Sequence, residues 1–367
     1  MIIMPKVGTA TAPLHGGHCP PWLFQKMTQL SAAIVEAIIV EFGTKEVLRR
    51  FADPVWFQAF GAVIGFDWHS SGLTTVGLGA LKEGLSQKQR ELGLFIVGGK
   101  GNTARQTPRE IDAIGERAAL PQNIGHLKDT SRLVAKVDNA LVQDGYQLYH
   151  HVMIFTADGQ WTVIQQGMND QSQTARRYHW LSDTVKSFTV EPHHGIVGRK
   201  VPHVLNLTEK DNVPIQHASL QLARQPEEVL LALRSLRMNH GEKELIMPSH
   251  HDIPQAQYLN KALDALYQRD PHSYQDLVMT PGVGAKTLRA LAMVAEIIFG
   301  SPITYHDPVR YSFAHGGKDG IPYPVNRRDY NHSLQILEEA LNKARIDDRT
   351  KLASLRRLAH WDNPTQS

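Results

Sequence analysis

One segment of the chain reads Leu277-Val-Met-Thr-Pro-Gly-Val-Gly-Ala-Lys-Thr-Leu-Arg-Ala-Leu291. It predicts a short helix that ends near Met279, a hairpin over Pro281–Gly284 and a second helix from about Ala285 to Phe299. The glycines permit a tight reversal and bring bare backbone N–H groups close to whatever lies outside. These groups begin a helix, and the unpaired donors and positive dipole end of a helix N-terminus favour a phosphate oxygen. The segment therefore predicts a helical domain with an anion-binding turn.

This segment resembles the helix-hairpin-helix, a motif that binds the DNA backbone in many repair enzymes, polymerases and nucleases. The resemblance implies contacts that position the protein on nucleic acid without reading the bases. The residues that would make or support these contacts are Pro281, Gly282, Val283, Gly284, Lys286 and Thr287. The alternative is a glycine hairpin inside an ordinary helical domain.

The composition describes an ordinary globular protein. The chain has 367 residues, of which 42% are hydrophobic and 20% are charged, so it is long enough for two domains and a sizeable core. The net charge of +3 is too small to indicate a polyanionic partner, so any basic surface must come from clustering. Cys19 is the single cysteine, which excludes an internal disulfide and favours a reducing compartment.

Membrane and export signals are weak in this sequence. The N-terminal residues lack the apolar stretch of a signal peptide. The most apolar helical segment, Ile34–Phe42, carries Glu36 and Glu41 and is too short to cross a bilayer. We therefore expect a cytoplasmic protein with no membrane partner.

Two helix starts are marked by local sequence. Asp53-Pro54 has the form of an N-cap followed by a first-turn proline. Thr107-Pro-Arg-Glu110 has the form of a capping box, in which the Thr107 and Glu110 side chains would each bond a backbone N–H of the other's residue.

A β-hairpin is predicted in the middle of the chain. Two strands, at about Tyr146–Thr156 and Trp161–Gln166, flank the turn sequence Asp158-Gly159, which is a strong hairpin signal. Simple alternation along the first strand places one set of side chains on a single face of the sheet. That set is Asp144, Tyr146, Leu148 and His150.

Acidic and imidazole side chains suggest a metal site in the first half of the chain. In the polar segment from 65 to 75, Asp67 and His69 alternate and would face the same way on an extended backbone. They could hold a metal or act as an acid/base pair, or they could belong to a hydrogen-bonded turn. Asp144 and His150 of the predicted hairpin would complete a site for Mg²⁺ or Mn²⁺.

The hairpin also broadly resembles restriction-type nucleases, which place an acid before a hairpin and hold a divalent ion. Gln165 and Gln166 stand where that group carries an acid and a lysine. The resemblance implies that a bound metal would activate water against a phosphodiester.

Other cationic side chains are candidates for phosphate contacts. Lys100 lies in the turn Gly98-Gly-Lys-Gly101, directly after a predicted strand. Arg176 and Arg177 are followed by Tyr-His-Trp, a combination that suits backbone contacts with base stacking. The alternative is a surface arginine pair over a small aromatic cluster.

The residues that follow the predicted helix-hairpin-helix resemble a segment of DNA glycosylases that contain this motif. Resemblance to the lyase members of that group implies that Lys286 is a Schiff-base nucleophile and that Asp307 stabilises the reaction electrostatically. The alternative is that Lys286 lies in the first turn of a phosphate-binding helix and Asp307 caps the next element.

These elements divide the chain into three predicted parts. Residues 1–210 form an α/β (or α+β) domain with a β-hairpin-containing sheet, 211–252 form a linker and helix, and 253–367 form an all-α nucleic-acid-binding domain.

Five strings across the chain resemble a bacterial and archaeal family catalogued as domain of unknown function 763. They begin at Pro13, Gly65, Gln143, Ala175 and Ala314, and the resemblance supplies no activity. The residues themselves predict a DNA-binding enzyme of DNA repair or processing, with metal-dependent phosphodiester hydrolysis. A glycosylase/lyase and a non-catalytic DNA-binding protein are the alternatives.

Overall fold

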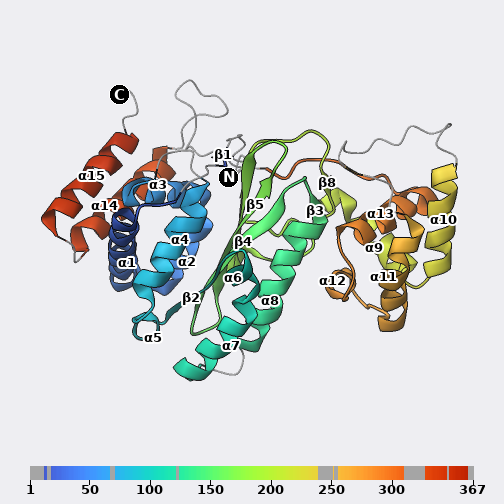
Figure 1. Cartoon of the computed structure of the whole chain (residues 1–367), viewed down its shortest axis with the longest axis horizontal. Helices are drawn as coiled ribbons and strands as arrows, with labels where there is room; N and C mark the ends of the chain where they lie inside the picture. The colour runs from blue at the N-terminus through green and yellow to red at the C-terminus, as the bar shows by residue number, and fades with distance from the viewer. Residues whose placement is uncertain are drawn as a thin grey trace.

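The computed structural model describes residues 12–14, 18–66, 71–120, 124–238, 251, 255–309, 327–344 and 347–362. It has mixed α/β architecture, in which one antiparallel sheet separates two helical layers and a further group of helices lies at one end (Figure 1). This confirms the predicted mixed N-terminal part and helical C-terminal part.

The central sheet has the strand order β1-β6-β5-β4-β2, and β7 pairs with β6. Every pairing is antiparallel. Its strands are β1 (Ala12–Pro13), β2 (Leu94–Lys100), β4 (Gln147–Thr156), β5 (Trp161–Asn169), β6 (Thr174–Leu181) and β7 (Gly195–Val197). A separate pair joins β3 (Val142–Gln143) and β8 (Leu205–Asn206). The predicted hairpin is confirmed as β4 and β5, and Gly159 in its turn has the positive φ of +84°.

A bulge in β4 overturns the predicted alternation of its side chains. Leu148 pairs with Gly167, but His150 pairs with Gln166, so two steps on β4 match one step on β5. The extra residue, Tyr149, shifts the following side chains by one position. His150 therefore lies on the opposite face from Leu148, and the prediction that both share a face with Asp144 is wrong.

Helices cover both faces of the sheet, and each face has its own apolar core. On one face α1 (Pro21–Phe42), α2 (Thr44–Ala52), α3 (Pro54–Ile64) and α4 (Leu78–Leu85) pack over Val152, Ile154 and Ile164. On the other face α7 (Thr107–Ala118) and α8 (Gly125–Lys136) pack over Met153, Phe155 and Val163. Short helical segments connect these layers: η1 (Leu73–Gly77), α5 (Gln89–Leu92), α6 (Asn102–Arg105), η3 (Val137–Leu141), η4 (Ser182–Thr184) and η5 (Lys210–Asn212).

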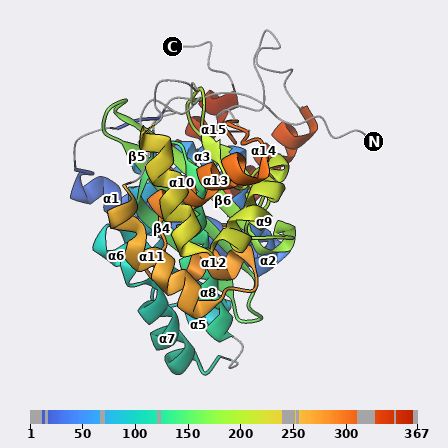
Figure 2. The same cartoon turned by 90° about the vertical axis from the view of Figure 1, so that its right-hand side faces the viewer.

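Five helices form the end group that Figure 2 faces: α9 (Val213–Leu222), α10 (Pro226–Met238), α11 (Ala256–Arg269), α12 (Tyr274–Met279) and α13 (Ala285–Phe299). Their apolar side chains join the same core as α7 and α8. The last two helices, α14 (Arg327–Lys343) and α15 (Asp348–Asp362), instead return to α1 and α3, at the opposite end in Figure 1. The proposed boundaries at 210 and 252 stay predictions.

The two predicted helix starts differ in outcome. Asp53 caps α3 through its Oδ1, which accepts from the N–H groups of Val55 and Trp56. Helix α7 begins at Thr107, but no side chain caps it, so the predicted capping box is wrong. Glu110 turns to the sheet and accepts from the N–H of Gly98 at 2.7 Å and from the ammonium of Lys82.

Helix α1 runs over 22 residues and is long and apolar enough to cross a membrane, judged by length and composition alone, so the prediction that its apolar segment is too short is wrong. In the structure its apolar side packs against α4 and α14 and buries Met27, Leu30, Ile34 and Ile38. A helix of this kind is equally typical of a protein core, and the cytoplasmic location stays a prediction.

Candidate functional site

Two neighbouring rows of polar side chains cross the sheet, one on each face. On the α1–α4 face the register aligns Lys100, His150, Gln166 and Arg177, one from each of four adjacent strands. On the opposite face the next row aligns His151, Gln165 and Tyr178. Except for Lys100 these side chains are buried, where an unpaired polar group is costly and most such groups bond to other protein groups.

Gln166 holds the first row together. Its amide nitrogen donates to the Ser71 carbonyl at 3.0 Å and to the Tyr149 hydroxyl, and its oxygen accepts from the Thr74 hydroxyl. Thr74 in turn accepts from Nε of Arg177 at 2.8 Å. Arg177 is 2% exposed and its guanidinium covers the ring of Phe57, so it lies inside the protein rather than on a phosphate-binding surface.

His150 is buried in this row and is neutral at physiological pH. Burial lowers its pKa to about 3, and the charges of His151, Arg177 and Lys100 act in the same direction. Among the described residues neither ring nitrogen has a hydrogen-bond partner. Lys100, by contrast, is exposed at the end of β2, with its ammonium 5.9 Å from the centre of the Tyr149 ring.

The second row extends into a chain of buried hydrogen bonds. Ser131 Oγ lies 2.9 Å from Nε2 of His151, whose Nδ1 lies 2.7 Å from Oε1 of Gln165. Nε2 of Gln165 donates to Oδ2 of Asp138 at 2.5 Å. Because a carboxylate only accepts, Asp138 orients the amide so that its oxygen faces His151.

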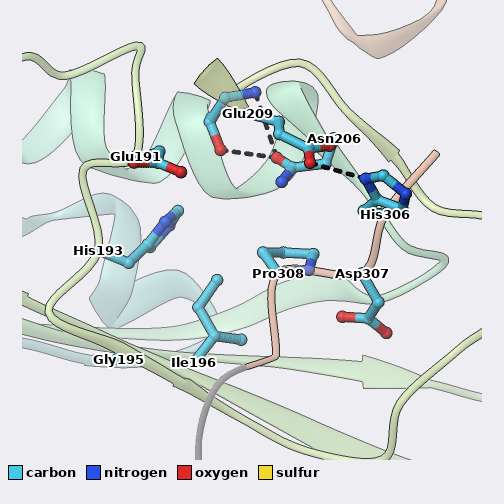
Figure 3. Close-up of a pocket in the computed structure, with 10 residues that line it drawn as sticks. Glu191, His193, Gly195, Ile196, Asn206, Glu209, His306, Asp307 and Pro308 are labelled. Atoms are coloured by element: carbon cyan, nitrogen blue, oxygen red, sulfur yellow. Dashed lines mark hydrogen bonds and ion pairs between the residues drawn. The ribbon is translucent and has the colours of Figure 1, made fainter. Parts of the chain in front are cut away.

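Through His193, Asp138 links this series of hydrogen bonds to a small pocket of about 110 Å³. Its Oδ2 also accepts from Nε1 of Trp180 at 2.9 Å, and its Oδ1 lies 2.5 Å from Nε2 of His193, which lines the pocket. Figure 3 shows Glu191 and His193 on one side of the pocket and Asn206, Glu209 and His306 across from them. His306 Nδ1 lies 2.7 Å from a carboxylate oxygen of Glu209.

A second buried cluster occupies the same face of the sheet nearer the helical end. Arg176 donates to Asp144 at 2.8 Å and, with both terminal nitrogens, to Asp307 at 3.1 and 2.7 Å. Tyr178 also donates to Asp144, at 2.7 Å. Burial disfavours the charged guanidinium of Arg176 and by itself would lower its pKa. The attraction of the Asp144 and Asp307 carboxylates is larger, so the pKa is raised above its ordinary value. Arg176 is 0% exposed, so it is an internal ion-pair partner and not a surface contact.

The predicted metal ligands are only partly described and are not brought together. Asp67 and His69 lie outside the described residues. Asp144 is engaged by Arg176 and Tyr178, while His150 lies on the other face of the sheet. In the part of the chain that the structure describes, no group of three or more histidine, cysteine, aspartate or glutamate side chains is placed to hold a metal ion.

A basic cavity of about 720 Å³ opens beside the Ser131–His151 pair, between α6, α7, α8 and the start of β4. Its polar floor contains Ser131, His151 and Gln165. Its cationic side chains are Arg105, Arg109, Arg132 and Lys136. None of the described residues that line this cavity is acidic.

An adjoining groove of about 880 Å³ continues from the basic cavity, because Asn139 and Leu148 line both. Its cationic residues include Arg199, Lys200 and Arg289, and its acids are Asp170 and the ion-paired Asp144. Ala285, the first residue of α13, also lines it.

The turn between α12 and α13 is therefore next to the groove. The helix bounds agree with those predicted for the second helix, and Gly282 in the turn has a φ of +85°. Lys136 donates to the Thr280 carbonyl at 3.1 Å, which ties the turn to α8. Pro281, Gly282 and Lys286 are exposed, whereas Val283 and Thr287 are buried. The nucleic-acid-binding role of this turn stays a prediction.

Sequence reasoning missed Ser131, Asp138 and the cations of the basic cavity. Arg132 and Lys136 are spaced i, i+4 and so lie on one side of α8, which is a signal that the sequence did contain. Ser131 and Asp138 carry no comparable local signal, because their hydrogen-bond partners lie far away in the sequence: His151, Gln165, Trp180 and His193.

Comparison with curated proteins and with solved structures finds no significant match. The family model described as Protein of unknown function (DUF763) matches residues 8–325, most of the chain, and the protein belongs to this family.

Proposed function

We propose that the protein binds the sugar-phosphate backbone of a nucleic acid along the basic cavity and the adjoining groove. The observation that carries this proposal is the distribution of charge along their lining. Arg105, Arg109, Arg132 and Lys136 line one part, and the exposed Arg199 and Lys200 line the other, where Arg289 is buried. Since none of the described acids lines the basic cavity, the surface favours a polyanion despite a net charge of only +3.

The α12–α13 turn supports the same proposal. The first turn of α13 has backbone N–H groups without helical acceptors, and no side chain caps them from Gly284. The dipole of this helix adds partial positive charge at the groove, where Ala285 lines the wall. A backbone bound there would be held through its phosphates, so we expect little dependence on base sequence.

Metal-dependent cleavage is not part of this proposal. The described residues supply no group that could hold a metal ion, and Asp144 is engaged in a buried ion pair. The lyase alternative is likewise without support from geometry, because both carboxylate oxygens of Asp307 already accept from Arg176 and from the N–H groups of Val201 and Val309.

Fluorescence anisotropy with labelled single-stranded DNA, duplex DNA and RNA over a range of KCl concentrations tests the proposal. Binding should weaken with salt, with a slope in log K against log salt of about −0.9 per neutralised phosphate on duplex DNA. The variant Arg105→Glu/Arg109→Glu should bind at least about tenfold more weakly, since it reverses two charges in the basic cavity.

The matched control is Arg90→Glu/Arg117→Glu. It makes the same change in net charge at exposed arginines that line neither cavity. The proposal is wrong if no nucleic acid binds at low salt, or if the control weakens binding as much as the cavity variant does.

A further inference from the structure

The geometry around Ser131 is that of a serine beside a general base. Its Oγ lies 2.9 Å from Nε2 of His151, within hydrogen-bond reach. Ser131 lies in the middle of α8, where a serine hydroxyl commonly bonds to its own helix. Here the hydroxyl instead points to an imidazole on the neighbouring strand.

The proton positions of this pair follow from its neighbours. Asp138 accepts from the Gln165 amide nitrogen, so the amide oxygen faces Nδ1 of His151 and requires a proton there. Nε2 then carries the lone pair, and the Ser131 hydroxyl is the donor to it. This is the tautomer that a general base needs in order to take the serine proton.

His151 is neutral in this setting. Burial lowers its pKa, while the Gln165 hydrogen bond and the charge of Asp138 partly oppose that shift. The free-base form is therefore the one present at neutral pH. Gln165 and Asp138 act as positioning residues, since they set the tautomer of the base through their hydrogen bonds.

The pair also has access to an anion. Ser131 and His151 line the basic cavity although both are buried, so they form its floor. Arg132 follows Ser131 on the exposed side of α8, and Arg105 and Arg109 line the same cavity. Such guanidinium groups suit the oxygens of a phosphate ester and the charge that develops on them during reaction.

We propose that Ser131 is a nucleophile that attacks the phosphorus of a phosphate ester held in the basic cavity, with His151 as its general base. The Ser131 Oγ–P bond forms, the P–O bond to the leaving alcohol breaks, and the serine proton passes through Nε2 of His151 to that alcohol. Water then attacks the phosphorus of the serine ester while His151 takes its proton, and the Oγ–P bond breaks. His151 returns that proton to Oγ of Ser131, which regenerates the serine and the neutral base as the phosphate product leaves. The substrate class rests on the proposed function, but the reactivity of Ser131 does not.

A fluorophosphonate probe tests that reactivity directly. Attack by Ser131 would form the Oγ–P bond and release fluoride, leaving an adduct that peptide mass spectrometry can locate. We expect labelling at Ser131 in the full chain, none at that position in Ser131→Ala, and labelling at least about 100-fold slower in His151→Gln, because a general base contributes about 10²–10⁴-fold. Ser86→Ala, which alters an exposed serine outside the cavity, should label at the wild-type rate.

Thermal unfolding of each variant separates loss of reactivity from loss of fold. If His151→Gln unfolds early, the pH dependence of wild-type labelling replaces it, and the rate should fall as His151 becomes protonated. Absence of labelling in the folded wild-type chain, or an adduct only at other residues, would overturn the proposal. Labelling without nucleic-acid binding would instead refute the proposed function and leave Ser131 as a nucleophile for another phosphate ester.

Discussion

Arg176 and Asp307, 131 residues apart in the sequence, form a buried bidentate ion pair. Arg176 belongs to β6, whereas Asp307 follows the last helix of the end group. The same guanidinium also binds Asp144 and the Arg199 carbonyl, so one side chain joins the sheet, the loop after β7 and the chain beyond α13. Asp307 therefore has a structural role as the ion-pair partner of Arg176, and its presence does not require a Schiff-base reaction at Lys286.

Asp307→Asn should therefore destabilise the protein. Asp144 still compensates the charge of Arg176 in this variant, but an amide cannot accept from both terminal nitrogens of Arg176 as the carboxylate does. Each lost hydrogen bond between charged groups typically costs about 1.5–3 kcal/mol. Lys286→Ala, at an exposed position in the first turn of α13, should change the free energy of unfolding by less than about 0.5 kcal/mol. Urea unfolding followed by circular dichroism measures both. Equal stability of the two variants would refute the structural role of Asp307.

Gly284→Asp should separate helix stability from nucleic-acid binding. Apart from its chain neighbours, no heavy atom of the described residues lies within 4 Å of the position that a Cβ would take at Gly284. The backbone there has the extended φ of −140° that suits an N-cap. Aspartate would cap α13 and raise its stability, but its charge would repel a phosphate at the groove. Gly284→Asn is the uncharged control of equal shape. We expect at least about fivefold weaker binding for Asp than for Asn at low salt, as estimated from charge–dipole energies of about 1 kcal/mol.

Removal of divalent metal should leave nucleic-acid binding intact. The proposed contacts come from protein cations and a helix N-terminus, which need no bridging ion. Anisotropy titrations in EDTA and in Mg²⁺, at matched ionic strength, should give affinities within about twofold of each other, a difference worth less than about 0.5 kcal/mol. Binding that disappears in EDTA would instead favour a metal site that includes residues outside the described chain.

Acid should destabilise the fold through His150. Its pKa is about 3 in the folded protein, below the ordinary value of 6.5, so the unfolded chain binds the extra proton between these pH values. The stability contributed by neutral, buried His150 is complete above pH 6.5 and is lost as the pH falls toward 3. Over this range the free energy of unfolding falls by up to about 1.4 kcal/mol per pH unit.

His150→Gln should therefore make the free energy of unfolding less dependent on pH over this range. The slope should not vanish, because burial also lowers the pKa of His151 and of His179. Urea unfolding at several pH values between about 7.5 and about 4.5 measures the slope. An unchanged slope in His150→Gln would contradict the prediction.

Gly98→Ala should destabilise the edge of the sheet. Gly98 has a φ of +89°, and an added Cβ would lie 2.1 Å from the His151 carbonyl oxygen. The strain and the clash should cost about 2 kcal/mol or more. Gly79→Ala is the matched control, because Gly79 is helical and, outside its own helix backbone, no heavy atom of the described residues lies within 4 Å of the added Cβ. This variant should gain up to about 1 kcal/mol in stability. Thermal unfolding that ranks the two variants in the opposite order would contradict this account.

Local sequence predicted those features whose partners lie within a few residues. The Asp53 cap, the Asp158-Gly159 turn and the bounds of α13 depend on backbone preferences and on neighbouring N–H groups, and each is present in the structure. The capping box at Thr107 has an equally good local pattern, yet Glu110 bonds to Gly98 and Lys82 instead. Donors distant in the sequence bind the Glu110 carboxylate in place of the local backbone N–H, and a local sequence pattern cannot indicate such distant partners.

Similarly, the sequence identified Asp144, His150, Arg176 and Arg177 as polar residues of interest but not where their side chains lie. A single bulge at Tyr149 moved His150 to the other face of the sheet, because side chains alternate with a period of two and one extra residue reverses them. Burial then converted Arg176 and Arg177 from expected surface contacts into internal partners of Asp307 and Thr74.

By itself, then, the sequence determined the mixed fold class, the central hairpin and the helix pair around Gly282, since these follow from periodicity, turn chemistry and composition. The family followed from the resemblance of whole sequence strings to its members. Only the tertiary structure decided that Ser131, His151, Gln165 and Asp138 form one hydrogen-bonded chain beside a basic cavity. Their contacts join α8, β4, β5 and η3, and side-chain proximity between separate elements depends on register and packing rather than on local preference.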